Sequence, residues 1–364
     1  MNTSALNIPP VAVSTLKTAL LAQFSDPLLR SRATMLWGTR GVGKSSVVKQ
    51  VADEASVPLI DLRLTTIEPV DLRGALFADD DLKQTVWFPP EFLPKPDQES
   101  GILFLDELTA ADQRLQTSAY SLILDRRVGD YQLPDGWMII AAGNAAFHGA
   151  VSYDMGTALA DRLFHFHVQS VIDAFLEYAL ENNFAPEVMA YLQVRPDKLD
   201  DTSQQLAQDH LTGASPRGWE DVSRVLQSAL DNQQQKLFIQ ARIGAANAAE
   251  FLAAIQELKA GSNVIALLDA LPGDATKALL PKSLDALYGL VYALASSATE
   301  RTRINRIIEI VEQFPDMPGS LPTQESQTLA MELILRKALE AGVEDQVVNS
   351  PAWARYNDKQ TTHV

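Results

Sequence analysis

The chain has 364 residues, of which 46% are hydrophobic and 21% charged, a composition typical of a globular protein. It carries 30 Lys and Arg against 46 Asp and Glu, a formal charge of −16, which argues against a protein that works by neutralising nucleic-acid backbones. The absence of Cys excludes a disulfide framework and any zinc or iron–sulfur site built on Cys, and it fits a reducing compartment.

Neither the N-terminus nor any internal segment has the features of a membrane or secretion signal. No run of 18 apolar residues is present. The first residues lack a basic segment, and Pro9 and Pro10 interrupt them before an apolar stretch begins. We therefore expect a cytoplasmic protein with no membrane partner.

The first half of the chain alternates short apolar runs with helix-length segments, the pattern of a parallel sheet with crossover helices. The apolar runs predict five strands, at residues 34–37, 58–64, 102–105, 137–142 and 163–168. Helices are predicted at 44–54 and 112–124, and a short one ends at Arg162. Two insertions interrupt this order, a β-hairpin at 74–94 and a smaller hairpin or turn at 127–135.

After about residue 168 the apolar residues recur at helical spacing, with no strand-like alternation. This pattern predicts helices at 173–182, 186–191, 216–230 and 236–259. The polar stretch 195–213 is predicted to be a loop, and the chain from 263 onward to be helical with proline breaks. The prediction is therefore an α/β core at 1–168, a helical lid at 169–262 and a helical C-terminal region at 263–364.

The segment GTRGVGKS, residues 38–45, matches G-x-x-x-x-G-K-[ST] between a predicted strand and a predicted helix. Such a loop points backbone N–H groups at phosphate oxygens, and the following helix N-terminus adds positive potential. A glycine-rich turn that spells the motif by chance is the alternative, and the strand–loop–helix context disfavours it. The expected phosphate-binding residues are Gly38, Thr39, Arg40, Gly41, Val42, Gly43, Lys44, Ser45 and Ser46.

Two carboxylates, Asp106 and Glu107, follow the buried strand ILFL, at the strand end where open α/β sheets bind ligands. Asp106, together with the Ser45 hydroxyl, is predicted to hold Mg²⁺, and Glu107 to activate water as general base. The alternative to a metal and catalytic site is a strand end at which the two carboxylates are only solvated. It loses weight because the pair follows a phosphate loop in an alternating pattern.

Three further residues are candidates for the same site. Asn144 follows the fourth strand and can hold the attacking water, although Gly-Asn pairs also commonly end strands. Arg162 can enter a neighbouring subunit's site as an arginine finger, with Arg126 and Arg127 as rivals, or can simply favour a helix C-terminus. Arg217 is predicted in the first turn of a helix, where a cation is disfavoured unless a phosphate lies nearby.

In chain order, GTRGVGKS, ILFLDE, GN, ADR and SPR resemble the motif set of an AAA+ ATPase, and specifically of the MoxR family. Both insertions and the phrase LTAADQRLQTSAYSLILDRRVGDYQLPDG are similar to that family, most clearly over about residues 30–235. The resemblance implies a sheet of order 5-1-4-3-2 and ATP hydrolysis in a hexameric ring. It also implies remodelling of protein clients, often with a partner that carries a von Willebrand factor A domain. Arg40 and the Ala-Ala after Asn144 depart from the commoner pattern, and neither removes a catalytic group.

Other features have simpler explanations. His165 and His167 share a face of a predicted strand and lack further metal ligands, so strand packing is expected. Asp79, Asp80 and Asp81 are expected to form a solvated turn. The apolar residues of the first insertion are expected to fold it onto its own domain, with contact to a client as the alternative; they are Leu76, Phe77, Trp87, Phe88 and Phe92.

Three functions remain open from the sequence. The first is a chaperone-like ATPase that remodels a protein client, favoured by the complete hydrolytic set and the lack of a basic stripe. The second is an AAA+ motor acting on nucleic acid, against which the net charge of −16 counts. The third is a scaffold whose assembly ATP controls while turnover matters little.

Overall fold

The computed structural model describes residues 7–79, 84–144, 157–261, 264–270, 279–317 and 321–361. The chain forms two compact units, the first made of residues 1–174 and 202–211 and the second of 175–201 and 212–364. Each unit is considered by itself. The finer division into three parts, with boundaries after residues 168 and 262, stays a prediction.

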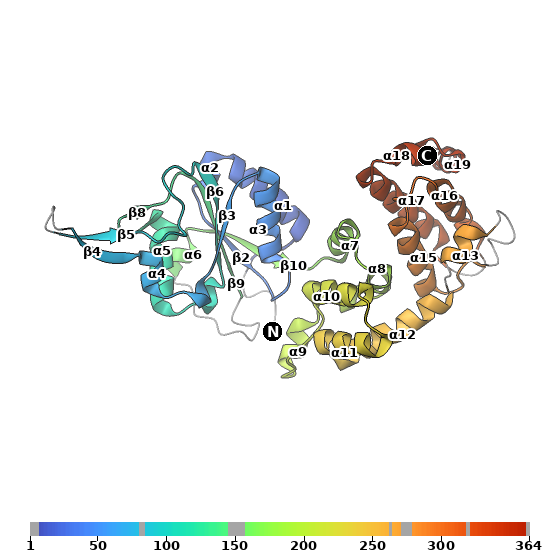
Figure 1. Cartoon of the computed structure of the whole chain (residues 1–364), viewed down its shortest axis with the longest axis horizontal. Coiled ribbons are helices and arrows are strands. Elements are labelled where there is room, and N and C mark those ends of the chain that lie inside the picture. The colour runs from blue at the N-terminus through green and yellow to red at the C-terminus, as the bar shows by residue number, and fades with distance from the viewer. Residues whose placement is uncertain are drawn as a thin grey trace. The chain divides into compact units, whose positions relative to one another are not determined.

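The first unit is built on a six-stranded parallel sheet of order β1-β10-β2-β9-β6-β3 (Figure 1). Its strands are β1 (Pro10–Ala12), β2 (Thr34–Trp37), β3 (Leu59–Arg63), β6 (Ser100–Asp106), β9 (Gly136–Gly143) and β10 (Phe164–Gln169). The five predicted strands and the α/β class are thereby confirmed, in the order 5-1-4-3-2. The sequence did not predict β1, which adds to the edge of the sheet beside β10.

Helices cover both faces of this sheet (Figure 1). On one face α1 (Val13–Ser25) and α3 (Lys44–Ala55) pack on alternate strand residues such as Leu36, Phe104 and Ile140. On the other face α5 (Gln113–Asp125) packs on the intervening residues, such as Met35, Leu103 and Ile139. Strands buried on both faces explain why they read as continuous apolar runs. This unit also contains three short helices, α2 (Pro27–Arg30), α4 (Pro69–Arg73) and α6 (Thr157–Ala160).

The two insertions are antiparallel hairpins, as predicted. The first pairs β4 (Ala75–Asp79) with β5 (Gln84–Phe88), and the second pairs β7 (Arg127–Val128) with β8 (Tyr131–Gln132). Asp80 and Asp81 of the predicted turn lie outside the described residues. In the first hairpin Leu76, Phe77 and Phe88 are exposed, whereas Phe92 beyond it packs on the core.

The second unit is helical, and two predictions for the chain after residue 194 need correction. The helix predicted at 236–259 is two helices, α11 (Asn232–Ile243) and α12 (Ala245–Gly261). Gly244 between them has φ of +85°, a left-handed conformation that ends a helix and favours glycine. The predicted loop 195–213 contains a 3₁₀ turn of the second unit, η5 (Pro196–Lys198), and a helix that belongs to the first unit, α9 (Thr202–Ala207).

The other described helices of the chain are, in chain order, α7 (Ile172–Glu181), α8 (Pro186–Val194), α10 (Pro216–Gln227), α13 (Val264–Asp269), α15 (Leu284–Ser296), α16 (Ile304–Glu312), α17 (Thr323–Glu340), α18 (Glu344–Val348) and α19 (Pro351–Thr361). Among the described residues, no helix has the length and hydropathy needed to cross a bilayer.

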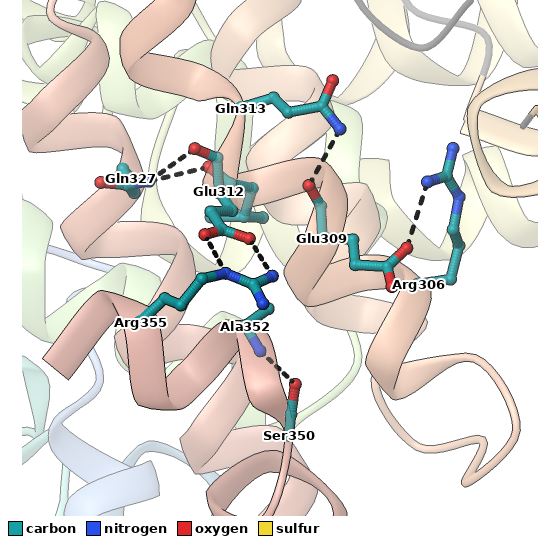
Figure 2. Close-up of polar contacts among 9 residues, drawn as sticks. Arg306, Glu309, Glu312, Gln313, Gln327, Ser350, Ala352 and Arg355 are labelled. Carbon is teal, nitrogen blue, oxygen red and sulfur yellow. Dashed lines mark hydrogen bonds and ion pairs between the residues drawn. The ribbon is translucent and has the colours of Figure 1, made fainter. Parts of the chain in front are cut away.

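Polar contacts hold the C-terminal end of α16 (Figure 2). Arg355 of α19 donates from Nε and Nη2 to the two carboxylate oxygens of Glu312, each at 2.6 Å. From α17, Gln327 Nε2 donates to the carbonyl of Val311 at 3.0 Å and to that of Glu312 at 3.3 Å. Two helices that follow in the chain are thus fastened to the same turn.

Candidate functional site

The predicted phosphate loop connects β2 to α3, as its motif requires. Gly43 is the N-cap of α3 and has φ of +104°, so glycine suits this position. With no side chain, Gly43 gives no cap to the first N–H groups of the helix. A helix N-terminus in this state is suited to an anion. Lys44 and Ser45 occupy the first two helical positions, and Ser46, next along, is exposed.

Lys44 brings the loop and the end of β9 together. Its Nζ donates to the carbonyl of Gly38 at 2.9 Å, to that of Thr39 at 3.0 Å and to Oδ1 of Asn144 at 3.0 Å. Asn144 lies 100 residues further along the chain. The sequence predicted that Asn144 serves the same site as Lys44, and the structure places the two side chains in direct contact.

Ser45 and Asp106 meet on the metal side of the site. Ser45 Oγ donates to Oδ2 of Asp106 at 3.2 Å, and Oδ1 of Asp106 accepts from the backbone N–H of Glu107 at 2.9 Å. A hydroxyl and a carboxylate are the hard oxygen ligands that Mg²⁺ prefers, so this donor set fits the ion. Asp106 also acts on a neighbouring carboxyl: burial, and then the negative charge of Asp106, raise the pKa of Asp61.

Glu107 has φ of +59°, the left-handed region that a non-glycine residue rarely adopts. Its Oε2 accepts a hydrogen bond from Thr65 Oγ1 at 2.5 Å. Thr65 follows β3, whereas Glu107 follows β6, so the contact joins two adjacent strand ends. Outliers of this kind persist where the surroundings impose them, and they concentrate at functional sites. Sequence reasoning did not identify Thr65.

A second threonine fixes Asn144. Thr109 is buried, and its Oγ1 both accepts from the backbone N–H of Asn144 and donates to its carbonyl, each at 3.1 Å. Both main-chain groups of Asn144 are therefore bound by one hydroxyl. Thr109 was also absent from the sequence-based predictions, because nothing in its local context separates it from other threonines.

The candidate finger arginines differ in their surroundings. Arg126 Nη2 donates to the carbonyls of Pro134 and Trp137, both at 2.7 Å, and burial lowers the pKa of its guanidinium. Arg127 is exposed and bonds to Gln132. Arg162 is also exposed, just after α6, and its guanidinium makes no hydrogen bond or ion pair with any other residue that the structure describes.

Arg217 belongs to the second unit, where it lies in the first turn of α10 as predicted. Ser215 is the N-cap, and its Oγ accepts from the N–H of Gly218 at 3.1 Å, with Pro216 at the first helical position. A cation at this position opposes the helix macrodipole. The role of Arg217 in nucleotide sensing stays a prediction.

Comparison with known proteins supports an ATPase domain over part of the chain. Residues 34–148 match the sequence model of AAA, the ATPase family associated with various cellular activities. This segment contains the loop, the acidic pair and Asn144. A solved structure of a "putative ATPase" from Cytophaga hutchinsonii ATCC 33406 is similar at 14% identity, over 88% of this chain and 79% of that chain, with a TM-score of 0.33. None of the curated proteins matches this chain in sequence.

Proposed function

We propose that this chain hydrolyses ATP and uses the energy to remodel a protein client, as a MoxR-like member of the AAA+ ATPases. One observation carries the proposal: Lys44, Ser45, Asp106, Glu107 and Asn144 gather at the same edge of the parallel sheet. Open α/β sheets bind ligands at this edge. The AAA match over residues 34–148 supports it independently.

In this proposal the amides of residues 38–45 and the Lys44 ammonium bind the phosphates of ATP. Ser45 and Asp106 would hold Mg²⁺, which would neutralise charge that develops on the phosphates. Glu107 takes a proton from the attacking water, and the Asn144 side chain orients that water. Thr65 binds the Glu107 carboxylate and Thr109 binds the Asn144 main chain, so both residues are held in place by a threonine.

In the proposal Arg162 and Arg217 connect the nucleotide site to a neighbouring subunit and to the helical lid. Arg162 from a neighbouring subunit completes the site as a finger that stabilises negative charge in the transition state. Of the three candidates it is the one whose guanidinium is both exposed and unengaged by described residues. Arg217 couples loss of the γ-phosphate to a movement of the helical lid. These roles require a homo-oligomer, which we propose to be a hexameric ring.

In this proposal the client is a protein. A protein that carries a von Willebrand factor A domain is a candidate partner, and the ATPase works in the cytoplasm. The formal charge of −16 supports a protein client over a nucleic acid. A basic surface would be needed to hold a phosphate backbone at physiological salt.

The test is ATP turnover by the Glu107→Gln variant. This change keeps the shape of the side chain and removes the general base, so we expect nucleotide binding to persist while hydrolysis falls by about 100-fold or more. Glu68→Gln, at an exposed carboxylate in the same unit, is the matched control and should retain full turnover. Undiminished hydrolysis by Glu107→Gln would rule out the proposed mechanism.

A further inference from the structure

One histidine in the first unit makes two directed contacts that strand packing does not explain. Trp37 Nε1 donates to His165 Nδ1 at 2.9 Å, and His165 Nε2 lies 2.7 Å from the carbonyl oxygen of Ala160. The two ring planes differ by 22° and their centroids are 6.0 Å apart, so the rings lie nearly coplanar and meet edge to edge through this hydrogen bond. His165 therefore connects the end of β2 to the turn that precedes its own strand, β10.

The partners define the proton on this ring. The Trp37 indole N–H is a donor only, so Nδ1 of His165 must be the acceptor and carry no proton. The Ala160 carbonyl is an acceptor only, so Nε2 must carry the proton and donate it. His165 is thus a neutral imidazole in a single tautomer, and each ring nitrogen has a partner.

The contact with Ala160 fixes a segment that carries Arg162. In this turn the N–H of Arg162 donates to the carbonyl of Leu159 at 3.0 Å, and that of Leu163 to the carbonyl of Ala160 at 3.4 Å. The second bond is long, whereas the His165 bond to the same carbonyl is short. The Arg162 guanidinium has no hydrogen-bond partner among the described residues. The position of the Arg162 side chain is therefore set by the backbone of this turn.

The other end of the connection reaches the nucleotide loop. Trp37 is the last residue of β2 and directly precedes Gly38, the first residue of the loop. One imidazole therefore holds the residue before the phosphate loop on one side and the turn of the candidate finger on the other.

His167, on the same strand, serves as a comparison because its environment fits strand packing alone. It lies two residues further along, so its side chain points to the same face of β10. It is buried, and its Nδ1 has no hydrogen-bond partner among the described residues. The expectation of strand packing therefore suits His167 and is too simple for His165.

We propose that His165 is a positioning residue for Arg162, because its neutral ring holds the turn at residues 159–163 against Trp37 at the end of β2. The proposal rests on the proposed function only for the role of Arg162 in hydrolysis. That His165 holds the turn is a separate claim with its own measurement.

The first measurement is amide hydrogen exchange over residues 159–163 in the full-length chain. His165→Phe keeps an aromatic ring but removes both hydrogen bonds, so exchange in this turn should become about fivefold faster or more. His165→Gln supplies one acceptor and one donor and should restore part of the protection. Trp37→Phe removes only the donor to Nδ1 and tests the same link should His165→Phe fail to fold. His167→Leu, on the same strand and face, should leave exchange in the turn unchanged.

The second measurement is a double-mutant cycle on ATP turnover with Arg162→Ala. We expect His165→Phe to lower kcat about tenfold with little change in nucleotide affinity, and to have almost no further effect once Arg162 is absent. Losses that multiply, or a matching loss of nucleotide affinity, would overturn the positioning role.

The two measurements separate the possible failures. Unchanged exchange in both His165→Phe and Trp37→Phe overturns the inference whatever the turnover. Full turnover by Arg162→Ala would instead show that Arg162 is not the arginine finger. The proposed role of His165 in positioning Arg162 for hydrolysis would then fail as well, even if hydrogen exchange showed that the His165 ring holds the turn.

Discussion

At the scale of single residues, the site depends on hydroxyl groups that touch neither phosphate nor metal in the proposed mechanism. Thr109 binds both main-chain groups of Asn144, and Thr65 binds the Glu107 carboxylate. Each contact joins the ends of two strands that are distant in the chain. The Glu107 side chain and the Asn144 main chain are thus held by residues that follow neighbouring strands.

We predict that Thr109→Val lowers both stability and turnover. The substitution keeps the branched shape but removes the hydroxyl that bonds both the N–H and the carbonyl of Asn144, and each lost hydrogen bond costs about 0.5–1.5 kcal/mol. Urea unfolding should report this loss, and kcat should fall because Asn144 is no longer fixed.

Thr117→Val is the matched control, since the Thr117 hydroxyl is exposed and bonds only within its own helix, to the carbonyl of Gln113. Equal stability and turnover for Thr109→Val and wild type would contradict the assigned role of Thr109.

The sequence predicts the chemistry-bearing residues of the site better than their supports. The sequence predicts that Lys44, Asp106 and Asn144 share one edge of the sheet, because strand, loop and helix patterns surround them and parallel strands end at one edge; the structure brings Lys44 to Asn144 and Ser45 to Asp106. Thr65 and Thr109 contact residues 42 and 35 positions away, and no local pattern marks such a hydroxyl. His165 was recognised as a strand residue, but its partners depend on the register between β10 and β2.

At the scale of elements, α10 is held at its N-terminus by a buried carboxylate. Asp201 Oδ1 accepts from the N–H of Ala214 at 2.6 Å, and its Oδ2 accepts from Asn247 Nδ2 of α12 at 2.8 Å. The N–H of Asp201 donates in return to the carbonyl of Ala214 at 3.2 Å. Asp201 is 7% exposed, so water offers little substitute for these contacts.

We predict that Asp201→Ala destabilises the second unit by about 1–3 kcal/mol, because it removes the acceptor of two buried hydrogen bonds, one from the N–H of Ala214 and one from Asn247 Nδ2. Chemical denaturation followed by circular dichroism should show the loss, and the amide of Ala214 should exchange faster.

Asp197→Ala provides the comparison, because Asp197 is an exposed carboxylate four residues earlier in the chain. A change of similar size in this variant would mean that charge, not the buried contact, accounts for the effect.

Elements with strong periodicity were predictable, and short or interrupted ones were not. β1 has three residues, one of them Pro10, and its pairing with β10 is a tertiary contact without a local signal. The apolar spacing of 236–259 continues across Gly244, so periodicity alone joined two helices. The positive φ of that glycine, at which α11 ends, is a backbone feature that apolar spacing does not report.

At the scale of the whole molecule, the proposed mechanism divides one active site between two copies of the chain. Lys44 belongs to the copy that binds the nucleotide, and Arg162 to its neighbour. This division predicts that two inactive variants can complement each other when mixed. A mechanism in which each chain supplies its own complete site does not predict this.

We predict that Lys44→Ala and Arg162→Ala are each nearly inactive alone and regain turnover when mixed. In a mixed ring, an Arg162→Ala subunit with an intact loop can lie beside a Lys44→Ala subunit with an intact arginine. Random mixing should restore roughly a quarter of the wild-type rate at equal amounts, if each site needs one loop and one finger.

Mixing Lys44→Ala with Glu107→Gln is the control, because both changes damage the nucleotide-binding copy and cannot complement. Failure of the Lys44→Ala and Arg162→Ala mixture, with oligomers shown to exchange subunits, would argue that the finger acts within its own chain or is another residue.

The contact between Lys44 and Asn144 has a consequence for timing. As long as the ammonium binds the Asn144 oxygen, the amide is held toward Lys44 and one lone pair of its oxygen is occupied. An arriving triphosphate competes for the same ammonium with far greater negative charge. We therefore expect ATP binding to break the contact between Lys44 and Asn144. The amide can then turn toward the attacking water when ATP is present, and not in a subunit without nucleotide.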